Sequence, residues 1–149
     1  MWNLAFSIFL VLILSACGPA PTSAGVETEP PTDGAFIHIS HGSGDPHRAL
    51  MALSMANKMA EEGRDVLVYV DITGVELVLE DSEDITMEPF ESSHTLLGRL
   101  REKGVTVMAC PRCLQAAGKS ETDLIEGVVL AKAATFFTFT QGRILTLDY

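Results

Sequence analysis

Two hydrophobic periods alternate along the chain, and together they predict strands separated by helices. Residues 35–40 (AFIHIS) alternate with period two, which places His38 and Ile37 on opposite faces of a strand. Residues 64–71 (RDVLVYVD) are apolar on both faces, as is typical of a strand covered by helices on both sides. Further strands are predicted at 105–109, 128–130 and 143–149.

Helical spacing of apolar residues fills the intervals between these strands. Asp45 is a typical N-cap and Pro46 a typical first helical residue, so a helix is expected to begin there and to run through 47–62 until Gly63. The other predicted helical segments are a brief helix within 72–80, a helix from Ser92 or Ser93 to Lys103, a short helix at Leu124 and Ile125 behind a capping box, and a helix over 131–140.

The order of these segments predicts a three-layer α/β/α domain around a mostly parallel sheet. In such sheets, reactive groups and ligands gather at the carboxyl ends of the strands. Two segments that carry candidate chemistry follow strands at that edge: the loop 41–45 after the first strand, and Cys110 after the strand 105–109. We therefore expect the functional site at this edge of the sheet.

The first residues have the pattern of an export signal rather than of a domain. Residues 2–14 (WNLAFSIFLVLIL) are almost wholly apolar, but the run is shorter than the roughly 20 residues that span a membrane. The sequence Leu14-Ser15-Ala16-Cys17 resembles the lipobox of bacterial lipoproteins, in which the cysteine is lipidated and becomes the first residue. We therefore predict a signal peptide at 1–16 and lipidation of Cys17.

Composition predicts a tether between this signal and the folded domain. Residues 18–33 (GPAPTSAGVETEPPTD) have no apolar periodicity, so we expect 17–33 to be a disordered linker and 34–149 to be the domain. By resemblance to other lipoproteins, Gly18 after the lipidated cysteine favours the outer membrane, which predicts a lipid-anchored protein of the cell envelope on its periplasmic side. The net charge of −10 argues against nucleic acid or an anionic membrane surface as a partner.

The chemistry of the sequence is concentrated in Cys110-Pro111-Arg112-Cys113, where a predicted strand runs into the helix-forming residues 114–117. A helix N-terminus and a neighbouring arginine both stabilise a thiolate, so Cys110 is interpreted as a nucleophile. Cys113 is interpreted either as a resolving thiol or as a core cysteine one helical turn further on, and a small buried side chain is the alternative for Cys110 as well. His41, in the loop at the same edge, is a candidate proton acceptor.

An ordered set of short motifs resembles the DsrE/DsrF-like family over nearly all of residues 35–149. The set comprises Gly44-Asp45-Pro46-His47-Arg48-Ala49, Gly63 before a strand, Gly74-Val75 after it, Gly104-Val105 before the cysteine strand, Cys110 eight residues ahead of Gly118, Asp123-Leu124-Ile125-Glu126-Gly127-Val128 and Asp148-Tyr149. The resemblance implies a three-layer α/β fold, assembly into trimers or hexamers, and a persulfide on the cysteine at position 110. The predicted export and the second thiol, Cys113, distinguish this chain from the family's cytoplasmic sulfur-relay members.

These observations predict an extracytoplasmic sulfur-carrier or thiol-handling protein that uses Cys110 as a persulfide or mixed-disulfide carrier. Its expected partners are a thiol or sulfur-carrier protein and, through the lipid anchor, a membrane; no cofactor is expected. The sequence leaves open whether the protein turns over as a sulfurtransferase-like enzyme. The late helix carries Phe136, Phe137 and Phe139, which is more than one inward face needs, so part of its surface is expected to be an interface in a homotrimer or homohexamer.

The alternative function on the same scaffold is a metal-binding or a non-catalytic oligomeric interaction module. His38, His41 and His47 would have to meet the two thiols at the carboxyl edge, since imidazole and thiolate together suit copper or zinc. These histidines have no metal-ligand spacing on one element, and His38 between Ile37 and Ile39 is typical of a satisfied core or interface histidine. We therefore assign no metal ligands, and the sequence leaves open whether a metal binds.

Overall fold

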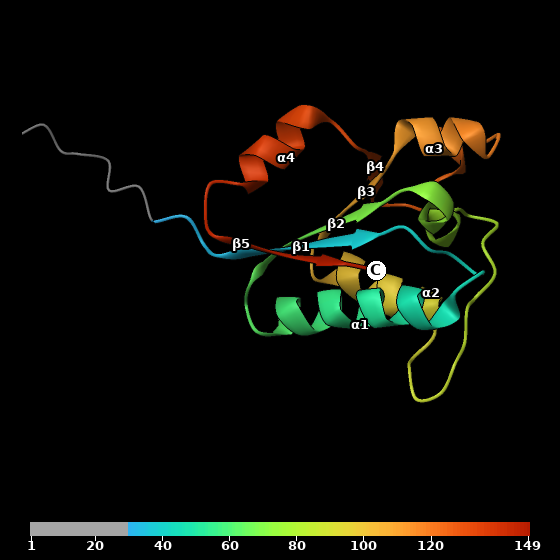
Figure 1. Cartoon of the computed structure of the whole chain (residues 1–149), viewed down its shortest axis with the longest axis horizontal. Helices are drawn as coiled ribbons and strands as arrows, with labels where there is room; N and C mark the ends of the chain where they lie inside the picture. The colour runs from blue at the N-terminus through green and yellow to red at the C-terminus, as the bar shows by residue number, and fades with distance from the viewer. Residues whose placement is uncertain (1–29) are drawn as a thin grey trace, which may run out of the picture.

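A single sheet with helices on both sides makes up the part of the chain that the computed structural model describes, residues 30–149 (Figure 1). The predicted signal peptide, the lipidation site Cys17 and most of the predicted tether lie outside the described residues. Within 30–149, no helix combines the length and the apolar character needed to cross a membrane.

Parallel pairing joins the five strands of the described residues in the order β4-β3-β2-β1-β5. The strands are β1 (Gly34–Ile39), β2 (Asp65–Val70), β3 (Thr106–Ala109), β4 (Val128–Leu130) and β5 (Ile144–Asp148). Every predicted strand is therefore present, and the sheet is wholly parallel where the sequence predicted a mostly parallel one. The predicted α/β fold class is confirmed.

The helices form two layers, one on each face of the sheet, and the two layers differ in size. Two helices, α1 (Pro46–Glu61) and α2 (Ser93–Glu102), cover one face of the sheet, whereas α4 (Ala133–Phe139) covers the other and α3 (Pro111–Ala116) lies beyond the end of β3 (Figure 1). In β1, Ile37 belongs to the buried core beneath α1 and α2, whereas Phe36 points to the opposite side and contacts Phe136 of α4. The alternation predicted for this strand is confirmed.

Side-chain caps fix where the two long helices begin. The carboxylate of Asp45 accepts the N–H of Arg48, and Pro46 is the first residue of α1, as predicted. The hydroxyl of Ser92 accepts the N–H of Thr95 in the same way and starts α2.

The predicted short helix at Leu124 and Ile125 is wrong. The predicted capping box does form, but it holds only the single 3₁₀ turn η2 (Glu121–Asp123) between the Ser120 and Asp123 side chains. Leu124 is instead buried and forms an antiparallel bridge with Leu79. The brief helix predicted within 72–80 is the 3₁₀-helix η1 (Ile72–Val78), and the helix predicted over 131–140 is the shorter α4.

Backbone-to-backbone packing at two glycines holds the loop after β1 against η1, which follows β2. A Cβ on Gly74 would lie 2.2 Å from the carbonyl oxygen of Ile39, and one on Gly42 would lie 2.5 Å from that of Thr73. Only glycine allows these approaches. They fix the geometry of the carboxyl edge, where the predicted site lies.

Candidate functional site

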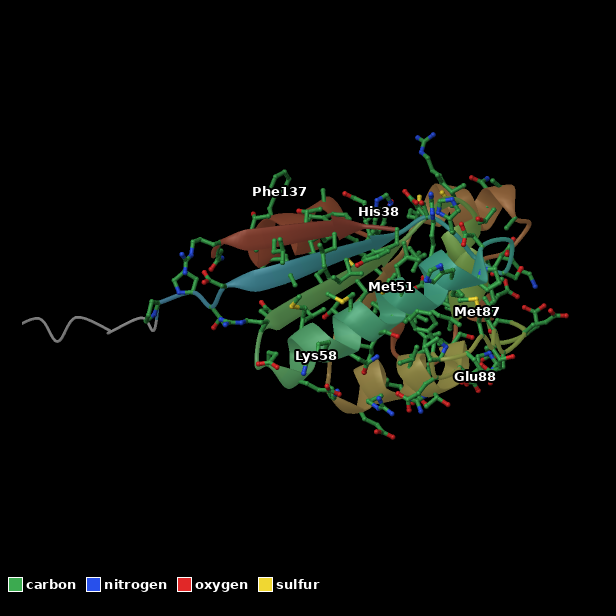
Figure 2. All side chains as sticks on the ribbon, turned by 60° about the horizontal axis from the view of Figure 1, so that its bottom comes forward. His38, Met51, Lys58, Met87, Glu88 and Phe137 are labelled. Carbon is green, nitrogen blue, oxygen red and sulfur yellow. The ribbon has the colours of Figure 1, made fainter. Side chains whose placement is uncertain are left out.

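The candidate site is at the carboxyl edge of the sheet, where β1, β2 and β3 end side by side. The N–H of Cys110 donates to the carbonyl of Val70 at 2.9 Å, which extends the pairing of β2 and β3 by one step. Cys110 then becomes the N-cap residue of α3, whose first residue is Pro111. Figure 2 shows His38 near the same end of β1.

The two predicted thiols lie together but differ in acidity. Both are free and partly buried. Burial opposes ionisation of Cys110, but hydrogen bonds from the Tyr69 hydroxyl, from the Cys113 backbone and thiol, and from the Arg112 N–H outweigh it, so the pKa of Cys110 lies below its ordinary value. Burial and the hydrogen bond with Cys110 raise the pKa of Cys113. Cys110 is therefore the thiol that ionises first.

A strained residue contributes a further donor to this pair. Ile72, the first residue of η1, has φ of 49°, a left-handed conformation that is rare for a β-branched residue. Its backbone N–H hydrogen-bonds to Cys113 and opposes part of the increase in the pKa of that thiol. Ile72 is 63% exposed, so burial of an apolar group does not account for this conformation. Strain of this kind is concentrated at functional sites.

Tyr69 is a site residue that sequence reasoning missed. It is in register with His38 of the neighbouring strand, and the two rings stack with centroids 5.6 Å apart. Phe136 packs edge-on against Tyr69 at 5.2 Å. Burial raises the pKa of Tyr69, and the adjacent Cys110 raises it further, so the phenol stays protonated and donates a hydrogen bond to the Cys110 sulfur.

His38 is held between two carboxylates. Its Nε2 lies 2.9 Å from Oδ1 of Asp71, and its Nδ1 lies 2.9 Å from Oδ1 of Asp148. Burial of the ring opposes its charge, but the hydrogen bonds with both carboxylates outweigh this and raise the pKa of His38. Two acceptors on opposite ring nitrogens favour the doubly protonated imidazolium. The prediction that His38 is a satisfied histidine agrees with these bonds.

His41 occupies the same edge but faces other groups. Its Nδ1 lies 3.0 Å from the Ser40 hydroxyl and its Nε2 lies 3.4 Å from Nη1 of Arg48. Its hydrogen bonds within 30–149 therefore go to these two residues rather than to a thiol. The structure brings Cys110 and Cys113 together with Tyr69, and the role proposed for His41 as a proton acceptor stays a prediction.

One signal in the sequence points to the missed residues. His38 and Tyr69 are each the penultimate residue of a strand, where a polar ring follows a run of apolar residues. Two adjacent parallel strands that carry polar rings at matching positions place those rings side by side on one face. The pairing of β1 with β2 was needed to use this signal.

The described residues contain no cluster of three or more histidine, cysteine or acidic side chains that is placed to hold a metal ion. Both nitrogens of His38 are engaged by carboxylates, and His47 packs against Phe90 at 5.5 Å. The arrangement at the carboxyl edge is suited to thiol chemistry instead.

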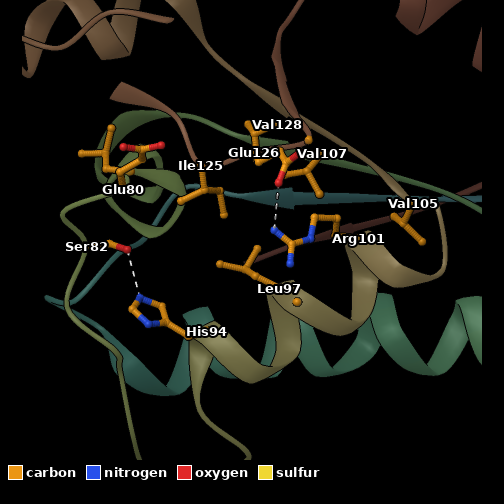
Figure 3. Close-up of a pocket in the computed structure, with 13 residues that line it drawn as sticks. Glu80, Ser82, His94, Leu97, Arg101, Val105, Val107, Ile125, Glu126 and Val128 are labelled. Atoms are coloured by element: carbon orange, nitrogen blue, oxygen red, sulfur yellow. Dashed lines mark hydrogen bonds and ion pairs between the residues drawn. The ribbon is translucent and has the colours of Figure 1, made fainter. Parts of the chain in front are cut away.

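A separate apolar pocket of about 280 Å³ lies between α2 and the strands β3 and β4 (Figure 3). Leu97, Val107 and Val128 are among its apolar lining residues, and His94 and Arg101 are among its polar ones. His94 pairs with the Ser82 hydroxyl at 3.1 Å, and Arg101 faces Glu126 at 3.9 Å. Neither Cys110 nor Cys113 lines this pocket, so it is distinct from the candidate site.

Solved structures with the same architecture include proteins from E. coli and Methanobacterium thermoautotrophicum. The ychN protein from E. coli superposes with a TM-score of 0.59 at 17% identity, over 78% of this chain and 99% of that chain. MTH1491 from Methanobacterium thermoautotrophicum, a protein of unknown function, superposes with a TM-score of 0.55 at 23% identity, over 78% of this chain and 99% of that one. At these identities the likeness shows the fold.

Sequence comparison gives the family. An uncharacterized protein of Methanopyrus kandleri, MK0008, is 34% identical over 95 residues, which cover 64% of this chain and 76% of that protein. The sequence profile of the DsrE/DsrF-like family matches residues 33–146. The chain therefore belongs to the DsrE/DsrF-like family, which is associated with sulfur relay.

Proposed function

We propose that this protein carries sulfane sulfur as a persulfide on Cys110 and passes it to a thiol of a partner protein. The observation that carries the proposal is the unequal pair of thiols, in which Cys110 has a lowered pKa and Cys113 a raised one. A thiolate is the reactive form in sulfur exchange, and hydrogen-bond donors around it also stabilise a persulfide anion.

Loading and transfer are two displacements at sulfur. In the first, the Cys110 thiolate attacks the outer sulfur of a donor persulfide, R–S–SH. A bond forms between Sγ of Cys110 and that sulfur, the S–S bond of the donor breaks, and R–S⁻ leaves. In the second, an acceptor thiolate attacks the outer sulfur of Cys110–S–SH and leaves with it, which restores the Cys110 thiolate. No cofactor enters either step, and the protein need not turn over as an enzyme.

Cys113 gives the loaded site a second outcome. If its thiolate attacks the inner sulfur of Cys110–S–SH, a Cys110–Cys113 disulfide forms and HS⁻ leaves. The raised pKa of Cys113 keeps it largely protonated at neutral pH, which makes this release slower than transfer to an acceptor thiolate. Cys113 is therefore proposed as a resolving thiol that acts when no acceptor is present.

Intact mass after incubation with polysulfide tests this proposal. Full-length protein with Cys17→Ser, which leaves only the two site thiols, is expected to gain ~32 Da that dithiothreitol removes. Cys110→Ser should abolish the gain, whereas Cys113→Ser should keep it and prolong its lifetime. A persistent adduct in Cys110→Ser, or no adduct on folded protein with both thiols reduced, would overturn the carrier role.

The setting we propose for this chemistry is the periplasmic side of the cell envelope, with the chain anchored through lipidated Cys17. The support is the apolar run 2–14 followed by Leu14-Ser15-Ala16-Cys17. In a bacterial host, the full chain should incorporate radiolabelled palmitate and sediment with outer membranes, and Cys17→Ser should lose both properties. Unlabelled wild-type protein in the cytoplasmic fraction would reject this setting.

A further inference from the structure

A carboxylate stands beside the proposed nucleophile. The last register pair between β2 and β3 is Val70 with Ala109, so the next residues, Asp71 and Cys110, are cross-strand neighbours. Adjacent strands lie about 4.8 Å apart. A negative charge on a side chain at a neighbouring cross-strand position disfavours ionisation of a thiol.

The charge of Asp71 already acts on the groups around Cys110. Burial raises the pKa of Tyr69 and of Cys113, and the negative charge of Asp71 adds to the increase for both. The Asp71 side chain is only 20% exposed, so solvent screens this charge incompletely. An uncompensated Asp71 would therefore oppose the chemistry proposed for Cys110.

His38 is placed to compensate that charge. Its Nε2 lies 2.9 Å from Oδ1 of Asp71, and its ring stacks on Tyr69 at an interplanar angle of 23°. Asp148 engages the other ring nitrogen from β5, and this carboxylate is 67% exposed and well solvated. The titratable groups that face His38 from the neighbouring strands are thus Tyr69 of β2, Asp71 directly after β2 and Asp148 of β5.

We propose that His38 is a positioning residue of the sulfur-transfer site, whose imidazolium neutralises Asp71 and whose ring supports Tyr69, so that Cys110 faces a hydrogen-bond donor instead of an uncompensated carboxylate. Asp148 favours the charged ring from the opposite side. The inference rests on the proposed role of Cys110 as the nucleophile. It assigns a role to three residues, Asp71, Asp148 and His38, that do not touch the transferred sulfur.

Alkylation of Cys110 by iodoacetamide, followed by peptide mass mapping in the full-length chain, measures the effect without any sulfur donor. His38→Phe keeps an aromatic ring against Tyr69 but removes the positive charge. We expect its alkylation at pH 7 to be about threefold to tenfold slower than in the wild type, with a rate profile displaced to higher pH. Adding Asp71→Asn should restore the rate to within about twofold of the wild type, because the opposing charge is then absent.

Matched variants separate charge from packing. His94 forms a similar pair with Asp84, at 3.9 Å, and belongs to α2, which covers the opposite face of the sheet from α4 (Figure 1), so His94→Phe should leave the alkylation of Cys110 unchanged. If His38→Phe does not fold, as judged by circular dichroism, His38→Gln provides the same comparison with and without Asp71→Asn. A wild-type rate in the His38 variant, or a slow rate that Asp71→Asn does not restore, would overturn the proposal.

The outcome also distinguishes this inference from the carrier function. If alkylation is slower in His38→Phe and restored by Asp71→Asn, but no persulfide forms on wild-type protein, the carrier role is contradicted and the role of His38 stands. If a persulfide forms on the wild type, but His38→Phe does not change the alkylation rate, the role of His38 is contradicted and the carrier role stands.

Discussion

At the scale of single residues, the acidity of Cys110 is a balance between burial and specific donors. Burial alone would raise the pKa of a thiol, and the donors that reverse this come from Tyr69 on β2 and from the first turn of α3. Because the folded-state pKa is lowered, the thiolate is populated at lower pH than in an ordinary cysteine. The rate of alkylation of Cys110 should therefore rise at lower pH than that of an unfolded control peptide.

Removal of the Tyr69 hydroxyl tests the largest of these donors. Tyr69→Phe should slow alkylation of Cys110 at pH 7 by about threefold to tenfold and displace the rate profile to higher pH, because a hydrogen bond to a charged group is lost. The matched control is Tyr149→Phe, which removes the chain's other phenol at the end of β5. Equal rates in the two variants would show that the Tyr69 hydroxyl does not stabilise the thiolate.

The residues found and missed at this site differ in how far their partners lie along the chain. Cys110 and Cys113 could be predicted because a strand, two thiols and helix formers follow one another directly. The role of His38 depends on Asp148, which is 110 residues away, and on its register with Tyr69 across a strand pair. Local patterns do not contain the order of strands, so this part of the site required the structure.

At the scale of elements, η1 connects the end of β2 to the site. It begins at the strained Ile72, contacts α3 and packs against the loop after β1 through Gly74. Its short apolar run predicted a brief helix, and its presence is confirmed. The period of the pattern did not reveal the tight approach of backbones, since that depends on atoms from two distant segments.

Two glycine substitutions should have opposite effects on stability. Gly74→Ala places a Cβ 2.2 Å from the Ile39 carbonyl oxygen, so the backbone must move, and we expect a loss of about 2 kcal/mol or more in the free energy of unfolding. Gly98→Ala lies within α2, where a Cβ meets nothing within 4 Å. Its higher helix propensity should add about 0.5–1 kcal/mol. Urea unfolding curves measure both values, and a Gly74→Ala protein as stable as the wild type would contradict the close packing of η1.

At the scale of the whole molecule, the two helical layers bury the sheet unequally. Six residues of α1 are buried, whereas α4 has no buried residue although it lies over the opposite face. Phe136 reaches inward to Phe36 and Tyr69, but Phe137 is 76% exposed and points away from the sheet (Figure 2). This distribution favours an interface over α4, where the sequence has more phenylalanines than one inward helix face needs.

A second copy of the chain is the cover that we predict, as part of a homotrimer or homohexamer. Burial of the Phe137 side chain in an interface would contribute about 1.5–3 kcal/mol to association. A charge at this position should therefore be strongly unfavourable. Phe137→Asp should convert the wild-type assembly at micromolar concentration into smaller species in sedimentation velocity, with the helix content preserved. Thr95→Asp adds the same charge on the exposed surface of α2, in the opposite layer, and should leave the assembly intact. A monomeric wild type, or equal dissociation in both variants, would contradict an interface over α4. Dissociation of the Phe137→Asp variant alone would place the interface beside the aromatic cluster that supports Tyr69. The subunit interface would then lie next to the thiol site.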